Sequence, residues 1–66
     1  MNATEKQAVI DRNIDRLRRE APKDFAFIGE KDVRYALGVL VDNPDILSVG
    51  PDETSPADID FIATYY

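Results

Sequence analysis

Apolar side chains in the first third of the chain recur with the spacing of an amphipathic helix. They form one narrow stripe, which consists of Ala3, Ile10, Ile14, Leu17 and Ala21. Asn2 or Thr4 can cap the start of such a helix. Pro22 biases the residue before it away from helical angles and so ends the element. The pattern predicts a helix over residues 3 to 21.

A second helical pattern covers residues 30 to 42. Its apolar positions follow i, i+3, i+4, i+7 and i+8, at Val33, Ala36, Leu37, Leu40 and Val41. Glu30 and Asp32 suit a helix N-terminus, and Asn43-Pro44 supplies a stop. Every second residue from 33 to 41 is also apolar, and Gly38 costs a helix about 1 kcal/mol relative to alanine. The acidic start and the Ala and Leu content favour the helix over the strand.

The remaining apolar segments fit short strands better. Phe25 to Ile28 is a run closed by Gly29, which we interpret as a short strand or an irregular piece filling the core. Ile46 to Val49 is a compact apolar stretch, and residues 57 to 66 alternate and are rich in strand-favouring side chains. Ser55-Pro56 also resembles a helix start. We favour a hairpin of residues 46–49 with residues 57–66.

This order of elements predicts a single small α+β domain over residues 1–66. An N-terminal helix, a second helix and a C-terminal β-hairpin together resemble a reduced winged-helix arrangement. The alternative is a three-helix mini-bundle in which the tail is the third helix. In either fold we expect Phe25, Phe27 and Phe61 in the core, because a chain this short needs its large apolar side chains there.

Charge is distributed very unevenly along the chain. All eight Lys and Arg residues precede Tyr35, whereas six of the 13 acids follow it. The net charge of −5 therefore belongs to the second half, where no cation offsets the acids. Such a surface repels phosphate groups and membrane headgroups and attracts basic proteins.

The uncompensated acids suggest a docking surface for a basic partner protein. We expect a non-enzymatic protein-binding module or small acidic inhibitor, whose carboxylates act as a nucleic-acid mimic on a partner's nucleic-acid-binding surface. Tyrosines at the end of the chain offer anchors beside the acids. The expected partner-binding residues are Asp42, Asp45, Asp52, Glu53, Asp58, Asp60, Tyr65 and Tyr66.

Two other functions fit the pattern less well. A winged-helix-like DNA-binding regulator would use the arginines of the first helix, but acids would line its wing. A dimeric scaffold or assembly subunit would use the apolar stripe of that helix as its seam. The chain is expected to be a monomer or a homodimer.

The composition argues against catalysis and cofactors. The chain has no cysteine and no histidine, so thiolate and imidazole chemistry and their metal sites are excluded. No serine or lysine lies in a nucleophile motif. We expect no enzyme activity, no metal, no cofactor and no membrane segment, and we expect a cytoplasmic location because cysteine is absent.

Overall fold

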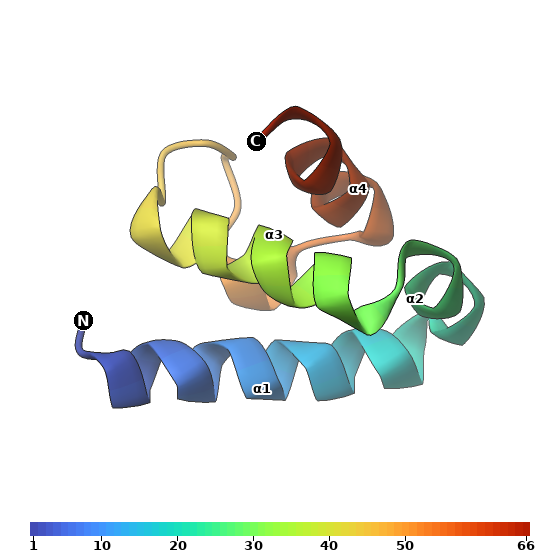
Figure 1. Ribbon diagram of the computed structural model, residues 1–66, viewed down its shortest axis with the longest axis horizontal. Coiled ribbons are helices and arrows are strands. Elements are labelled where there is room, and N and C mark those ends of the chain that lie inside the picture. The colour runs from blue at the N-terminus through green and yellow to red at the C-terminus, as the bar shows by residue number, and fades with distance from the viewer.

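The computed structural model describes all 66 residues, and it is entirely helical (Figure 1). The elements in chain order are α1 (Ala3–Glu20), α2 (Pro22–Ile28), α3 (Glu30–Asp42), the 3-10 turn η1 (Pro51–Glu53) and α4 (Pro56–Tyr65). Helix α1 runs along one side, α3 crosses the middle of the molecule, and α4 lies on the side of α3 opposite α1.

Helix α1 begins and ends where the sequence indicates. The side chain of Asn2 accepts a hydrogen bond from the backbone N–H of Glu5 at 2.8 Å, which caps the first turn. Ala21 has φ −140°, outside the helical range, as expected for a residue that precedes proline. Pro22 then occupies the first turn of α2, where its missing N–H costs nothing.

Gly29 joins α2 directly to α3. Its φ of 94° is open to glycine and strained for other residues, and it is the C-cap of α2 and the N-cap of α3 at once. The predicted helix over residues 30 to 42 is confirmed, with Glu30 and Asp32 in its first turn.

The core lies between α1, α3 and α4. Its members are buried aliphatic side chains, namely Ile10, Ile14, Leu17, Val33, Ala36, Leu37, Leu40, Ile59 and Ile62. Phe25 and Ile28 of α2 pack against its edge. The expectation that all three phenylalanines lie in the core holds in part for Phe25 and is wrong for Phe27 and Phe61, which are 88% and 44% exposed.

The predicted C-terminal β-hairpin is wrong, and with it the winged-helix-like arrangement. Residues 46–49 form bends, residues 25–28 belong to α2, and residues 56–65 form α4. Ser55 and Asp58 make a full capping box at the start of α4, and this local signal outweighs the strand-favouring composition. A helical bundle, the alternative fold, describes the structure better.

The long connection between α3 and α4 is held to α1 by a polar cluster, which we call the Asn13 clamp. Asn13 is fully buried and donates to the carbonyl of Val9 at 2.8 Å and to Oδ1 of Asp52 at 3.0 Å. Arg12 donates to both oxygens of the Asp52 carboxylate, at 2.7 and 2.6 Å. The clamp thus fastens η1 to the middle of α1.

Arg16 completes the Asn13 clamp. Its Nε donates to the side-chain oxygen of Asn13 at 3.0 Å, and its Nη2 donates to Thr54 Oγ1 at 2.9 Å and to the Pro51 carbonyl at 3.3 Å. Thr54 is 2% exposed and directly precedes the cap of α4. The clamp therefore fixes where α4 begins.

Replacing Gly38 or Gly29 by alanine should change the free energy of unfolding in opposite directions. A Cβ at Gly38 would meet Ile10 Cδ1 and Lys6 Cε at 3.8 Å, which is ordinary contact, whereas Gly29 has a positive φ. Gly38→Ala should raise the free energy of unfolding by roughly 0.5–1 kcal/mol through helix propensity. Gly29→Ala should lower it by about 1–3 kcal/mol. Urea denaturation followed by circular dichroism measures both, and a stabilising Gly29→Ala would contradict this account of the α2–α3 junction.

Removing the centre of the Asn13 clamp should destabilise the whole domain. Asn13→Ala removes the hydrogen bonds to Val9 and Asp52 and leaves the largely buried Arg16 side chain without one acceptor, so we expect a loss of about 1–3 kcal/mol. Asn43→Ala is the matched control, because Asn43 is exposed and donates to a single carbonyl, that of Val39. Chemical denaturation should separate the two variants, and equal losses would show that the clamp is not a stabilising centre.

Candidate functional site: an exposed aromatic face on α2 and α4

Helix α4 has apolar side chains on two faces. Its inward face places Ile59 and Ile62 in the core, at 1% and 0% exposure. Its outward face carries Phe61 and Tyr65, which are 44% and 73% exposed. A helix that is apolar around most of its circumference is normally buried on all sides. The outer face of α4 is therefore the surface that most needs an explanation.

The aromatic rings at the end of α4 form a cluster centred on Phe61. The ring of Tyr65 lies 5.3 Å from it in a tilted arrangement, and the ring of Tyr66 lies 6.1 Å away, edge to face. From α3, the hydroxyl of Tyr35 donates to the backbone oxygen of Tyr66. Tyr66 is 55% exposed, so the cluster is ordered by contacts within the domain and still open to solvent.

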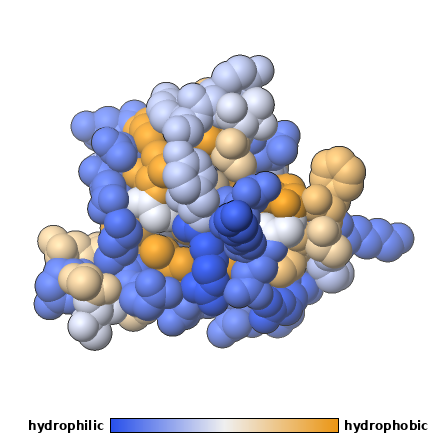
Figure 2. All heavy atoms as spheres, viewed as in Figure 1, coloured by the Kyte–Doolittle hydropathy of each residue, from blue (hydrophilic) through white to orange (hydrophobic).

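A shallow hollow continues this surface toward α2, and we call it the α2–α4 groove. Residues from both helices and from the turn between η1 and α4 line it: Asp24, Phe27, Ile28, Ser55, Pro56, Ala57 and Asp60. Phe27 forms an exposed wall, and apolar groups reach the surface at this end of the molecule in Figure 2. Ala57 and Phe61 are one turn apart, so the groove runs into the ring cluster.

The aromatic face, defined as Phe27, Phe61, Tyr65 and Tyr66, contains two of the residues expected to bind a partner. These are Tyr65 and Tyr66. Phe27 and Phe61 were assigned to the core from sequence. Their exposure follows from helical geometry, because Phe25 and Ile28 share the inward side of α2 and Ile59 and Ile62 share that of α4.

The six acids of the second half do not form one continuous negative flank. Asp42 pairs with Lys6 of α1 at 2.7 Å, and Asp52 pairs with Arg12 at 2.6 Å. Asp58 closes the capping box of α4 through the backbone N–H of Ser55, at 2.9 Å. These three carboxylates have structural partners within the domain.

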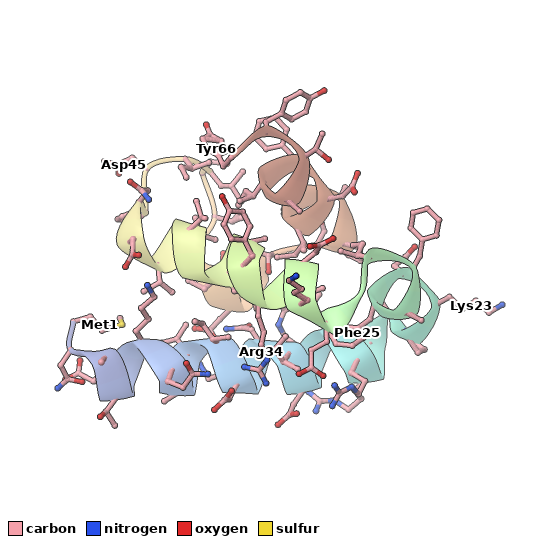
Figure 3. The ribbon with its side chains drawn as sticks, viewed as in Figure 1. Met1, Lys23, Phe25, Arg34, Asp45 and Tyr66 are labelled. Atoms are coloured by element: carbon pink, nitrogen blue, oxygen red, sulfur yellow. The ribbon has the colours of Figure 1, made fainter.

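The other three acids make no ion pair. Asp60 lines the α2–α4 groove, Glu53 belongs to η1, and Asp45 lies in the connection after α3. Figure 3 shows Asp45 and Tyr66 on the same side of the molecule, away from α1. Of the acids predicted from sequence, only Asp60 is brought to the groove, together with Asp24 of α2, which the sequence did not single out.

The cations of the first half serve mainly as internal partners. Ion pairs to carboxylates of the chain involve five of the eight: Lys6, Arg12, Arg16, Arg18 and Arg34. Arg18 also lies over the ring of Phe25, with its guanidinium carbon 4.9 Å from the ring centroid. Arg34, labelled in Figure 3, bridges Asp11 at 2.9 Å and Glu30 at 3.0 Å. Three arginines of the basic face of α1, Arg12, Arg16 and Arg18, are thus engaged in internal contacts, whereas Arg19 is exposed and makes no ion pair.

These ion pairs shift the acidity of their carboxylates. Hydrogen bonding from Arg12 lowers the pKa of Asp52 below its ordinary value of 3.8, and Asn13 adds to this effect. Hydrogen bonding from Arg34 likewise lowers the pKa of Asp11 and of Glu30. All three groups are charged at neutral pH and bind α1, α3 and η1 together in that state.

A metal site, an enclosed cavity or a membrane-spanning helix would each indicate another kind of function. No group of three or more acids lies close enough together to hold a metal ion. The seven-residue hollow among Leu17, Phe25 and Ile59 has an apolar lining and room for about one water molecule, about 10 Å³. None of the helices combines the length and the apolar character needed to cross a membrane. Comparisons of the chain with protein-family models, with curated proteins and with solved structures give no match.

The Asn13 clamp predicts acid-sensitive stability. Because the pKa of Asp52 is depressed in the folded state, its contribution is complete above about pH 3.8 and is lost as the pH falls below that value. Asp52→Asn should therefore lower the melting temperature at pH 7, and the difference from the parent should shrink toward pH 2.5. Asp45→Asn removes an exposed carboxylate without an ion pair, and it should have little effect at either pH. A difference for Asp52→Asn that stayed constant with pH would contradict the assignment.

Proposed function

We propose that this chain is a non-enzymatic protein-binding module that docks onto a partner protein through its aromatic face. The observation that carries the proposal is the exposed outer face of α4, on which the rings of Phe61 and Tyr65 lie beside polar side chains. Its exposed positions are Ala57, Asp60, Phe61, Thr64 and Tyr65, which follow i, i+3, i+4, i+7 and i+8. This is the spacing with which a helix packs against another structural element.

Energetics support this use of the surface. Burying a phenylalanine side chain gains about 1.5–3 kcal/mol, and three exposed aromatic rings are clustered at the end of α4, with Phe27 exposed in the adjoining groove. Aromatic side chains, tyrosine above all, dominate the binding energy of many interfaces. The ring cluster is already ordered by Tyr35 and by its own contacts, so little conformational entropy is lost when a partner covers it.

In this proposal the acids of the second half of the chain have a smaller electrostatic role than the sequence suggested. Asp42, Asp52 and Asp58 have internal partners, so a continuous array of carboxylates resembling a nucleic-acid backbone is not part of it. The remaining free acids act as rim charges that steer a basic partner and orient it. An inhibitory role remains compatible with docking, because a partner's own binding surface can be covered in this way.

Two alternatives lose their structural basis. A winged-helix DNA-binding regulator requires a wing, and the chain has no strand. A dimer seam on α1 requires its apolar stripe to be free, whereas Ile10, Ile14 and Leu17 are 6%, 2% and 3% exposed because they pack against α3 and α4.

Site-specific photo-crosslinking in the cells that make the protein tests the proposal. A benzophenone amino acid in place of Phe61 should give an adduct larger than the monomer, because the ring lies in the interface. The matched control places the same amino acid at Asp15, an exposed position on α1 that makes no ion pair. Circular dichroism verifies that both variants fold.

The outcomes are distinct. Adducts from Phe61 and none from Asp15 support docking through the aromatic face. The same adducts from both positions, or none from Phe61, overturn it.

A further inference from the structure

The charges around the α2–α4 groove point to the chemistry of its occupant. Two carboxylates line the groove, Asp24 from α2 and Asp60 from α4, and neither makes an ion pair. No lysine or arginine lines it. Lys23 is the neighbour of Asp24 in sequence, but Figure 3 shows its side chain extending away from the body of the molecule.

Five of the eleven other side-chain carboxylates in the domain are held by a cation of the chain, whereas Asp24 and Asp60 are not. Asp11, Glu20, Glu30, Asp42 and Asp52 are all paired with a cation of the chain. The groove instead combines an apolar floor of Ile28, Pro56 and Ala57 with two uncompensated acids and the exposed ring of Phe27. It therefore offers apolar contact along its length and negative charge from both of its helices.

We infer that the α2–α4 groove binds a basic amphipathic helix of the partner protein. The partner's apolar stripe would lie over Ala57 and Phe61, and lysine or arginine side chains flanking that stripe would reach Asp24 and Asp60. This inference rests on the proposed function and names the kind of partner segment that the site takes.

A helix fits the site better than an extended peptide. The chain has no strand, so it offers no sheet edge to which a peptide could add. The outer face of α4 has the i, i+3, i+4, i+7 spacing whose ridges pack against another helix. Its ten residues span about 15 Å, the length of nearly three turns of a partner helix.

A second copy of the same chain is a poorer occupant. In a two-fold symmetric dimer through this face, Asp24 and Asp60 of each copy would enter the same interface. Like charges at an interface oppose association unless cations intervene, and the groove supplies none. Charge complementarity thus favours a partner of opposite sign.

An NMR titration of the ¹⁵N-labelled protein with synthetic peptides tests the inference. The probe is a capped amphipathic peptide with leucines along one face and lysines on the other. Its counterpart has the same leucines and glutamate in place of lysine, and a third peptide is arginine- and proline-rich. We expect the Leu/Lys peptide to shift amide resonances of residues 24–28 and 56–61, and we expect the Leu/Glu peptide not to.

Two double variants distinguish the effect of the groove carboxylates on peptide affinity from the effect of the overall net charge. Asp24→Asn combined with Asp60→Asn should weaken binding of the Leu/Lys peptide roughly three- to tenfold at low salt, as expected for the loss of two exposed ion pairs. Asp15→Asn combined with Asp32→Asn changes net charge equally at exposed positions that make no ion pair, and it should change affinity less than about twofold.

Several outcomes overturn the inference. Equal binding of the Leu/Lys and Leu/Glu peptides would show that charge does not select the occupant. Stronger binding of the proline-rich peptide at the same amides would show that the bound segment is not a helix. Shifts confined to other surfaces, or self-association through the groove in a dilution series of the protein alone, would also contradict it. If crosslinking from Phe61 still captured a partner in these cases, docking would stand and only the identity of the bound segment would be wrong.

Discussion

The position of α4 depends on one buried polar side chain, that of Asn13. The chain between α3 and α4 has no strand and only one short 3-10 turn, so it cannot fix its own path. Asn13 bonds to α1 through the Val9 carbonyl and to η1 through Asp52, while Arg16 extends the network to Thr54. Because a buried amide without partners is costly, these bonds allow essentially one arrangement of η1 on α1. The capping box of α4 begins at the next residue, Ser55.

Contacts between the two halves of the chain reduce the charge asymmetry of the sequence in the folded domain. The basic first half and the acidic second half meet in the fold, at Lys6 with Asp42 and at Arg12 with Asp52. A lopsided sequence is therefore partly neutralised by its own folding. On the surface of α2 and α4, acids without an ion pair lie close to exposed aromatic rings, and this combination sets that surface apart.

Much of the helical framework could be predicted from the sequence, because α1 and α3 bury one face each; for α3 the acidic start and the Ala and Leu content decided between a helical and an alternating pattern. Helix α4 could not be assigned in the same way. It is apolar on both faces, so Ile59, Phe61, Ala63 and Tyr65 alternate as in a strand while Ile59 and Ile62 follow a helical spacing. Only the capping signal at Ser55-Pro56 distinguishes the two, and it outweighs the strand-favouring composition. Tyr65 and Tyr66 were expected at the site, but Phe61 was missed for the same reason, since it cannot be placed outward until the helix is known.

One member of the Asn13 clamp, Asn13 itself, can be recognised in the sequence pattern. Asn13 lies three residues after Ile10 and four before Leu17, which is a stripe position where a polar residue should find buried partners. Which partners it finds depends on contacts with residues about 40 positions away, and no local pattern encodes them. Long-range ion pairs such as Arg12 with Asp52 could not be predicted from the sequence either, because no local pattern encodes them.

The hydrogen bond from Tyr35 to the backbone oxygen of Tyr66 has a practical consequence. It holds Tyr66 against α3, beside the ring cluster and on the side of α3 away from α1 (Figure 1). An affinity tag or fluorescent fusion appended after Tyr66 would emerge within the surface that we assign to binding and would compete with any ligand there. Met1 is 77% exposed, so the amino terminus is the better point of attachment for immobilisation or labelling.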